Sequence, residues 1–557
     1  MKIKVKLSLW LLLVVGVIVL SLQQAGMGGG EIFNPGGLEL LGRFWKASLH
    51  PDLSYQLLQL TFQSTLTTLA YAVCGTFISV IFGIVAGIFA SEVWWWAILP
   101  YKTTQRSPWL GIRAILAVPR AIHEMLWGLF FVNIWGLDPL SAIGAIVLPF
   151  GAITAKVFSE ILDETPRQPL RILLNSGANP LNAFFYTLLP QAFPNLLSYI
   201  FYRFECSIRS AAVLGIIGAG GLGYQILLSL QSLRYEQLWT FFFALVILNG
   251  SVDFASAWLR RRLGCANRLD LNLHRQGRKL KINYQGDPII LSIGILLLAL
   301  IPFCFWYVQP QWSKLWSLRS LQLFTQATSA SLGLSITLPQ LEQLLHLASQ
   351  TLVMSILAMA IAASGGILLS FPASHNFFIP GGLLNPGNGG NWWTKLSYLL
   401  PLVITRIILL ICRAIPAPIW ALVALFITFP GILPGAIALG IHNLGILGRL
   451  MAEVTENLEK QPLQALKAQG TPAASVFLYG VLPPTLPRFL AYILYRWEVS
   501  LRETVIVGLV GAGGLGRLLS EQISSFDASG ILTTVGCLIV LTFIVDYFSS
   551  IARRALR

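Results

Sequence analysis

The chain has 557 residues, of which 55% are hydrophobic and 11% charged. A soluble domain carries about 25% charged residues, so this composition excludes a soluble globule and indicates an all-α polytopic membrane protein. Lysine and arginine outnumber aspartate and glutamate by 38 to 23. This surplus is typical of positively charged cytoplasmic loops, and we expect no nucleic-acid partner.

Twelve apolar runs are candidates for membrane-spanning helices, which need about 20 residues. The first run follows the lysines of residues 1–6 and is interpreted as a retained span with its lysines in the cytoplasm, although a signal peptide would look similar. The runs lie at 7–22, 57–90, 110–134, 139–159, 192–217, 236–258, 287–308, 347–371, 397–428, 431–452, 485–510 and 531–551.

Basic clusters support this count. With a cytoplasmic N-terminus, even-numbered spans end in the cytoplasm, and the sixth and twelfth spans end at 260–262 and 553–554, where arginines gather. Both termini are therefore expected in the cytoplasm. The sequence predicts a first unit at 1–258, a basic cytoplasmic linker at 259–284 and a second unit at 285–557.

An internal repeat explains the even count. Residues 199–209 reappear at 492–502, and the Gly-Ala-Gly-Gly-Leu-Gly run at 218–223 reappears at 511–516, both offset by 293 residues. Six spans separate equivalent points, so both halves have the same orientation in the membrane. The predicted fold is a tandem duplication of a six-helix unit, with parallel repeats and about twelve transmembrane helices.

Each half has a polar segment between its fourth and fifth spans that is too long for a tight turn. Within it, a proline suited to a first helical turn precedes a glycine suited to a helix end, so we predict two short cytoplasmic helices. Their marker residues are Gln168, Pro169, Leu170, Leu173 and Gly177 in the first half, and Gln461, Pro462, Leu463, Leu466 and Gly470 in the second.

Three charges lie within the fifth span, Arg203, Glu205 and Arg209, and the eleventh span repeats them as Arg496, Glu498 and Arg502. A charge at the bilayer centre costs about 2.5–3.5 kcal/mol, so these side chains must face protein or water. Helical spacing predicts that Glu205 pairs with Arg209, either to lock the helix or to line a pathway. Arg203 lies on another face of the same helix, where its partner would be a residue of another helix, such as Glu124, or an anion.

The glycine run matches the pattern Gly-x-Gly-x-x-Gly, but no strand precedes it, so it is not a nucleotide loop. It is expected to allow bending or close helix approach at an external gate. No Gly-x-x-x-x-Gly-Lys-Ser/Thr motif, metal-ligand set or catalytic constellation occurs in the sequence, and we expect no enzyme activity and no bound metal. The gate residues would be Gly218, Gly220, Gly221, Gly511, Gly513 and Gly514.

The chain resembles the permeases of bacterial ABC importers, and in particular the phosphonate permease family. The short helices match the cytoplasmic loop of these permeases, because each glycine is followed at twelve and thirteen residues by Leu-Pro. The family pattern Tyr-Arg-x-Glu-x-x-x-Arg followed by a glycine-rich stretch occurs twice, at 202–221 and 495–514. A leading glutamate of the loop is replaced by Arg171 and Gln464.

The resemblance implies two fused permease subunits in the inner membrane that import a phosphonate-like oxyanion such as phosphonate or phosphite. Two ATP-binding cassette subunits would dock at 166–180 and 459–473, and would supply the ATP and Mg²⁺ chemistry, so the chain itself needs no cofactor. A binding protein would deliver cargo outside. The pathway residues would be Arg203, Glu205, Arg209, Arg496, Glu498, Arg502, Glu124 and the family-like His442.

Three alternatives remain open at this point. The same scaffold could carry a small zwitterion such as betaine or methionine. An ion-gradient secondary transporter would work without ATPase partners and would not need the paired loops. A membrane scaffold without transport would not need them either.

Overall fold

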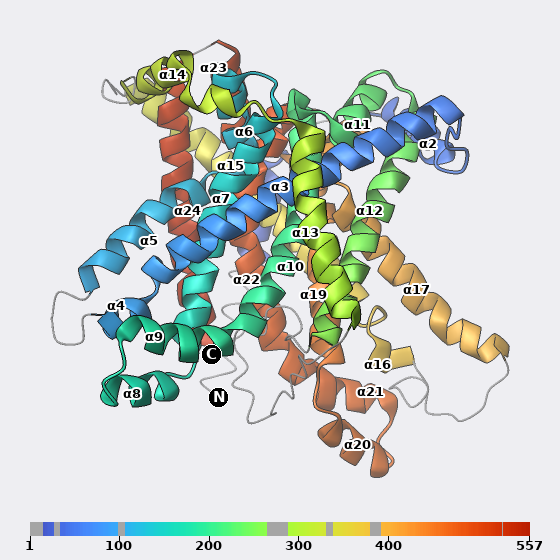
Figure 1. Cartoon of the computed structure of the whole chain (residues 1–557). Coiled ribbons are helices and arrows are strands. Elements are labelled where there is room, and N and C mark those ends of the chain that lie inside the picture. The colour runs from blue at the N-terminus through green and yellow to red at the C-terminus, as the bar shows by residue number, and fades with distance from the viewer. Residues whose placement is uncertain are drawn as a thin grey trace. The chain divides into compact units, whose positions relative to one another are not determined.

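A computed structural model describes residues 15–26, 34–98, 106–263, 288–329, 338–378, 392–525 and 527–556. This part of the chain is almost entirely helical (Figure 1). Its helices form two compact units. The continuous unit comprises residues 50–326, and the split unit joins residues 1–49 to residues 327–557.

The continuous unit contains the first copy of the repeat. Asp138 caps one of its long helices by accepting a 2.9 Å hydrogen bond from the Leu140 N–H, and Pro139 opens the first turn, as expected for a helix start. The elements are α3 (Tyr55–Ala90), α4 (Glu92–Ile98), α5 (Arg106–Ala121), α6 (Glu124–Trp135), α7 (Pro139–Glu164), α8 (Gln168–Asn175), α9 (Pro180–Ala183), η2 (Phe184–Leu188), α10 (Leu189–Leu214), η3 (Gly215–Ala219), α11 (Gly221–Gln231), α12 (Tyr235–Arg262), α13 (Pro288–Val308) and η4 (Trp312–Trp316).

The split unit contains the second copy. A short apolar helix, Val15–Gln24, precedes it, and α14 (Leu318–Ser329) crosses the boundary between the units. The other elements are α2 (Gly37–Ala47), α15 (Leu338–Ser370), α16 (His375–Phe378), α17 (Trp392–Ala414), α18 (Ala417–Ile427), α19 (Ile432–Glu456), α20 (Lys460–Ala468), α21 (Ala473–Ser475), η6 (Val476–Val481), α22 (Leu482–Val507), η7 (Gly508–Ala512), α23 (Gly514–Ser524) and α24 (Ala528–Leu556).

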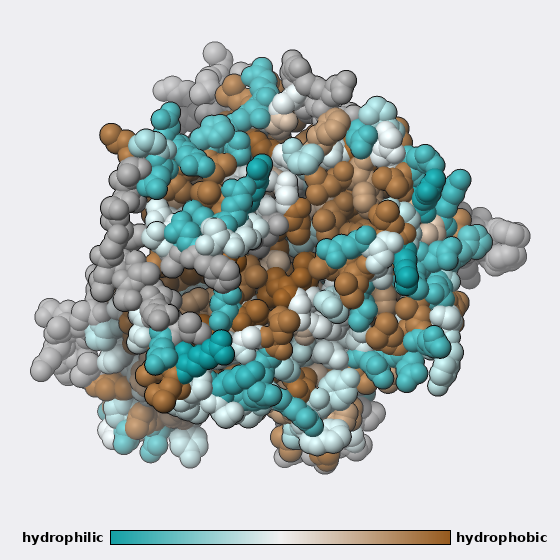
Figure 2. Space-filling model, turned by 90° about the horizontal axis from the view of Figure 1, so that it is seen from above, coloured by the Kyte–Doolittle hydropathy of each residue, from teal (hydrophilic) through white to brown (hydrophobic). Residues whose placement is uncertain are grey.

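Each predicted span coincides with an apolar helix, except that residues 7–14 of the first span lie outside the described part of the chain. Seven helices are long and apolar enough to cross a membrane, three further pairs qualify together but are bent, and Val15–Gln24 and Gly294–Val308 are shorter. Large apolar side chains such as Phe62, Ile81 and Val85 are exposed along α3, where lipid is expected to cover them. Hydrophilic side chains are interspersed with apolar ones on the face viewed from above (Figure 2). The fold class is thus confirmed.

The third and ninth spans are not the straight helices that the sequence predicted. The α5–α6 pair bends by 83° and the α17–α18 pair by 97°. The second helix of the first pair begins at His123, whose Nδ1 accepts from the Met125 N–H at 3.2 Å, and Pro416 occupies the same position before α18. These residues start a new helix where a continuous one was expected.

The two copies are equivalent in structure as well as in sequence. In both, a threonine of the second span accepts a hydrogen bond of 2.9 Å from a backbone N–H after the glycine run, Leu222 to Thr68 and Leu515 to Thr351. The separations along the chain are 154 and 164 residues. The second copy therefore has ten extra residues between its second and third spans, and the fold absorbs them without losing the contact.

Glycines set the closest helix packing in each unit. A Cβ on Gly83 of α3 would lie 2.5 Å from Thr154 of α7, and one on Gly440 of α19 would lie 2.9 Å from Ile361 of α15. Small residues allow helix backbones to approach closely, which is the main source of van der Waals attraction between helices in lipid. The second and fourth spans of each copy form its central pair.

The compact units do not follow the order of the repeat. In the split unit the Asn34 N–H donates to the Ile427 carbonyl at 2.7 Å, so the N-terminal segment packs on α18. In the continuous unit Phe305 of α13 contacts Phe77 of α3 edge to face at 6.4 Å. The boundaries 1–258, 259–284 and 285–557 remain a prediction about the repeat, and residues 264–287, most of the linker, lie outside the described part.

Candidate functional site: the charged helices and the cytoplasmic segments

The acid in the middle of each charged helix pairs with an arginine from the end of that copy's last span. Glu205 of α10 accepts from Arg260 of α12 at 3.1 Å, and both side chains are buried. Glu498 of α22 accepts from Arg553 of α24. Arg209, the partner expected from helical spacing, donates to the Glu205 backbone carbonyl at 3.5 Å, and Arg502 does the same to Glu498 at 3.4 Å.

Sequence reasoning placed Arg260 among the cytoplasmic charges at the start of the linker. The structure places it inside the protein, with 3% of its surface exposed. The signal for this pairing was present, because Arg260 and Arg553 are offset by the same 293 residues as Glu205 and Glu498. Breaking a buried pair such as Glu205–Arg260 costs about 3–5 kcal/mol. The Arg553 side chain is 28% exposed, so its pair with Glu498 contributes less.

The first arginine of each charged helix has different neighbours in the two units. The guanidinium carbon of Arg203 lies 3.9 Å from the centroid of the Phe150 ring and 6.0 Å from that of Tyr199. Arg496 donates from Nη2 to Glu503 at 2.7 Å and from Nε to the side-chain oxygen of Asn443. Phe150 and Asn443 are equivalent positions on α7 and α19.

Glu124 and His442 both lie beside the bends of the broken spans. Glu124 accepts from the Ser210 hydroxyl of α10 at 2.5 Å, and its other oxygen lies 3.2 Å from His123 Nδ1. The buried His442 ring on α19 lies with Nδ1 3.0 Å from the Ile415 carbonyl, at the end of α17. Both residues therefore connect a bent span to a neighbouring helix.

The two predicted cytoplasmic helices are present as α8 and α20. Gly177 and Gly470 follow them with φ of 83° and 75°, a left-handed conformation that glycine adopts readily at helix ends. Leu170 is fully buried, whereas Gln168 is exposed and Leu173 half-buried. In α20, Gln461 and Pro462 are exposed and Leu463 and Leu466 are half-buried. The helices present one face to the protein and leave the other open.

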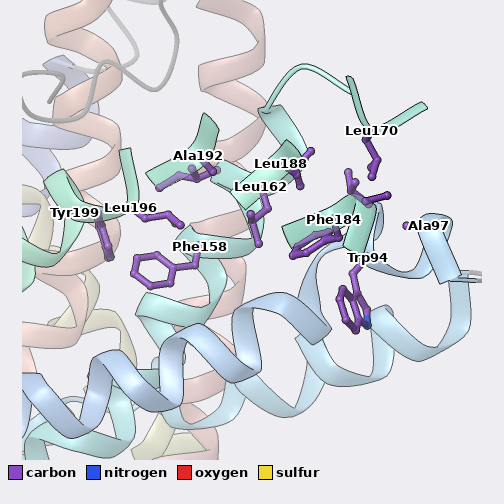
Figure 3. Packing of buried hydrophobic residues seen from close by; sticks show 13 residues of the cluster. Trp94, Ala97, Phe158, Leu162, Leu170, Phe184, Leu188, Ala192, Leu196 and Tyr199 are labelled. Atoms are coloured by element: carbon purple, nitrogen blue, oxygen red, sulfur yellow. The ribbon is translucent and has the colours of Figure 1, made fainter. Parts of the chain in front are cut away.

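An aromatic contact supports each of these helices. Figure 3 shows Leu170 in one cluster with Trp94 of α4 and Phe184 of η2, whose rings meet edge to face at 5.1 Å. In the split unit Phe377 of α16 and Phe477 of η6 form the same contact at 5.9 Å. Sequence reasoning did not identify these residues, because α4 and α16 are far from α8 and α20 along the chain.

The glycine runs bend the charged helices. Gly218, Gly220 and Gly221 have φ of 90°, 85° and 74°, and the span bends by 58° before α11. A Cβ on Gly221 would lie 2.5 Å from Thr68 Oγ1, and one on Gly514 would lie 2.7 Å from Thr351 Oγ1. The split unit repeats the pattern at Gly511, Gly513 and Gly514, with φ of 106°, 81° and 69°. Close approach and positive φ both require glycine here.

A second ion pair recurs in both units and was not predicted from the sequence. Arg113 of α5 bonds Asp163 of α7 at 2.9 Å, and Arg406 of α17 bonds Glu456 of α19 at 2.6 Å. Arg113 and Arg406 are equivalent residues at the 293-residue offset of the repeat, and so are Asp163 and Glu456. Within the described residues, no group of three or more histidine, cysteine, aspartate or glutamate side chains could hold a metal ion.

Comparisons with known proteins agree with this geometry. The family model for the binding-protein-dependent transport system inner membrane component matches residues 79–264 and 401–557, more than half of the chain. The chain is 25% identical over 442 residues to the phosphate-import permease protein PhnE of Mycolicibacterium smegmatis, covering 78% of this chain and 75% of that protein.

Two shorter relatives are also similar. The phosphite transport system permease protein PtxC of Stutzerimonas stutzeri is 29% identical, over 37% of this chain and 68% of its own length. PhnE2 of Escherichia coli, described as a cryptic phosphonate transport system permease protein, is 36% identical over 21% of this chain and 97% of its length. The chain belongs to the binding-protein-dependent transport system inner membrane component family, as a multi-pass permease of the phosphonate and phosphite type with the family domain in two copies.

Proposed function

We propose that this chain forms the membrane pathway of an ATP-driven importer for a phosphorus oxyanion: a phosphonate, phosphite or phosphate. One observation carries the proposal. Each unit places an arginine, Arg203 or Arg496, at equivalent points of its charged helix, with little of the side chain exposed. The planar guanidinium donates two parallel bonds to an oxyanion, and relatives named for phosphate, phosphite and phosphonate transport support that cargo class.

The remaining charged residues would shape the pathway. Glu205 and Glu498 hold the charged helices through Arg260 and Arg553. Arg209 leaves a net positive charge within the first charged helix, whereas Glu503 balances the remaining arginine of the second. A weakly positive lining attracts an anion without trapping it. Tight binding would therefore belong to a separate external binding protein, and the bent glycine runs would gate its side of the membrane.

Exposed apolar side chains support ATPase docking on the cytoplasmic segments. Tyr186 of η2 and its equivalent Tyr479 of η6 are each 78% exposed, and Ile172 of α8 is 65% exposed. Apolar residues on a segment expected outside the membrane indicate an interface. Two ATP-binding cassette subunits would cover residues 166–180 and 459–473 and would hydrolyse ATP with Mg²⁺, with both termini on the same cytoplasmic side.

The test uses the purified chain with its ATPase and binding-protein partners in liposomes. ATP-dependent accumulation of methylphosphonate, phosphite, phosphate and betaine would be measured side by side. Accumulation of a phosphorus oxyanion is the expected result. Accumulation of betaine alone would contradict the oxyanion assignment. Uptake that needs no ATP would favour an ion-gradient secondary transporter over an ATP-driven importer.

Substitution of the two arginines tests the pathway role within the same assay. Arg203→Ala combined with Arg496→Ala should abolish oxyanion uptake while ATPase binding stays intact. Arg517→Ala is the matched control, because that arginine pairs with Glu521 on an exposed face of α23. Normal uptake by the double variant would remove the arginines from the pathway.

A further inference from the structure

An arginine joins three helices at the same place in both units. Arg113 of α5 donates from Nη2 to Asp163 at 2.9 Å and from Nε to the Ala90 carbonyl, the last residue of α3, also at 2.9 Å. Arg406 of α17 donates from Nη2 to Glu456 at 2.6 Å and from Nε to the Ala373 carbonyl at 3.0 Å. Each guanidinium thus bonds an acid on one side and a helix end on the other.

The same contacts form in both units although the number of residues between the partners differs. The arginine follows its carbonyl partner by 23 residues in the continuous unit and by 33 in the split unit. The acid has also changed, from aspartate to glutamate. Because the contacts persist despite the extra residues and the longer side chain, the junction itself is retained rather than the local sequence.

The acid of each junction also holds a small helix that supports the cytoplasmic segment. Asp163 accepts from the Val93 N–H at 3.1 Å and from the Ser91 hydroxyl at 2.6 Å, which fixes the start of α4. Glu456 accepts from the His375 N–H at 3.0 Å, at the start of α16. The first turns of α4 and α16 carry Trp94 and Phe377, which contact Phe184 and Phe477.

The arginine lies on the bent span. Arg113 is in α5, which bends into α6, and α6 is bonded to the charged helix α10 through Glu124 and Ser210. The acid is in the last turn of α7, immediately before α8. The junction therefore lies between the segment proposed to bind an ATPase and the helix proposed to contact cargo.

We propose that the Arg113–Asp163 and Arg406–Glu456 pairs are positioning residues that make each cytoplasmic segment and its bent span move as one body. The inference rests on the proposed function for the identity of the moving partner. Charge-assisted hydrogen bonds in a partly buried site resist separation better than apolar contacts, which slide. Without the pair, motion of α8 or α20 would not reach α5 or α17.

The first readout is the ratio of cargo taken up to ATP hydrolysed, in liposomes holding the full complex. Asp163→Asn and Glu456→Gln should each lower this ratio by about tenfold, with ATP hydrolysis nearly unchanged. Asp163→Glu and Glu456→Asp, which give each unit the other unit's acid, should retain it. A wild-type ratio in both amide variants would overturn the proposal, as would equal losses in the amide and acid-exchange variants.

The second readout does not depend on the cargo. Spin labels at Ile172 of α8 and Ile115 of α5, both exposed, would report their distance with and without ATP in a chain whose six native cysteines are replaced. The distance should stay constant in the wild type and change with ATP in Asp163→Asn. A distance that changes in the wild type, or in neither protein, contradicts the rigid junction. Failure of oxyanion uptake with a constant distance contradicts only the cargo.

A matched control lies on the same helices. Lys156 pairs with Glu160 of α7 at 3.7 Å, and Arg449 pairs with Glu453 of α19 at 2.9 Å, each within one helix. Glu160→Gln removes a charge close to Asp163 without separating two helices, and is the control for Asp163→Asn. Glu453 also interacts with Arg406 of the junction, so it does not serve as a control. Glu160→Gln should retain the wild-type ratio, and a loss equal to that of Asp163→Asn would indicate a general charge effect instead.

Discussion

Arg203 and Arg496 are equivalent residues in two copies of one unit, and the two copies accommodate the same charge in different ways. Arg203 lies over the Phe150 ring, whereas Arg496 is held by Glu503 and Asn443. An arginine within the membrane needs an electrostatic partner, and both an aromatic face and a carboxylate meet that need. The duplication kept the arginine and left its surroundings free to diverge.

Two further positions, one on the bent span and one on the charged helix, differ between the two units. The continuous unit has Glu124 on the bent span and Ser210 on the charged helix, and the split unit has Ala417 and Glu503 at the equivalent positions. Each copy thus keeps one acid in this pair of positions, carried by a different helix. As a result, Arg496 is neutralised by Glu503 on its own helix, while Glu124 accepts a hydrogen bond from Ser210.

The largest expected loss of stability follows substitution of Glu503, the residue that distinguishes the surroundings of Arg496 from those of Arg203. Glu503→Ala should lower the free energy of unfolding by about 3 kcal/mol, because Arg496 loses its buried partner. Ser210→Ala, at the equivalent position, should cost about 1 kcal/mol, the value of one hydrogen bond. Thermal unfolding of the purified chain in detergent measures both. Equal losses would mean that Glu503 is not the group that compensates Arg496.

A smaller effect is expected at the aromatic partner of Arg203. Phe150→Leu preserves apolar packing but removes the cation–π contact, and should cost about 1 kcal/mol. Phe150→Tyr keeps an aromatic face and should cost less. Unfolding of the two variants under the same conditions tests this, and an identical loss in both would show that the ring acts through its volume alone.

The smallest effect concerns a contact that only the continuous unit has. Burial opposes the ionisation of Asp138, but hydrogen bonds from Lys314 at 2.8 Å and from the Leu140 and Gln311 N–H groups outweigh it and lower the pKa of Asp138. Position 431, its equivalent in the split unit, is glycine. Because the folded pKa lies below the ordinary value, the contact stabilises at neutral pH and is lost as the pH falls from about 4 through the lowered pKa.

Hydrogen exchange across pH checks this difference, after correction for the intrinsic rate. Protection at the start of α7 should fall by about 1 kcal/mol in acid, and protection at the start of α19 should not. Lys314→Ala should reduce the fall at α7. A fall of the same size at both helix starts would assign the acid sensitivity to the fold in general rather than to Asp138.

The sequence predicted the spans, the repeat, and the helices α8 and α20, because each depends on composition, periodicity or spacing within one segment. It did not predict the bends at His123 and Pro416, since each was interpreted as a point within one long span, at 110–134 and 397–428. It also placed Arg260 in a solvated linker, because a basic cluster after a span is typical of a cytoplasmic loop. Only the packing of α12 on α10 shows that this arginine turns inward to Glu205.

Pairing between segments was the general limit of sequence reasoning. Helical spacing predicted a Glu205–Arg209 pair, whereas Arg209 bonds the Glu205 backbone carbonyl and the Glu205 carboxylate bonds Arg260. Spacing within one helix gives no access to partners 50 or more residues away, such as Arg113 and Asp163. Comparison of the repeats partly supplies this information. Charged positions that recur at the 293-residue offset include both members of each pair, and a search for them identifies the junction acids without a structure.

The division of the chain between the two units has a consequence for its synthesis. Residues 50–326 leave the ribosome as one stretch, so the continuous unit can assemble while the rest is still being made. The split unit must wait, because residues 1–49 precede the continuous unit along the chain and pack on α18, which ends at Ile427. A stop codon in the linker would therefore release an N-terminal segment whose partner has never been translated, so the genetic fusion guarantees that both are made together.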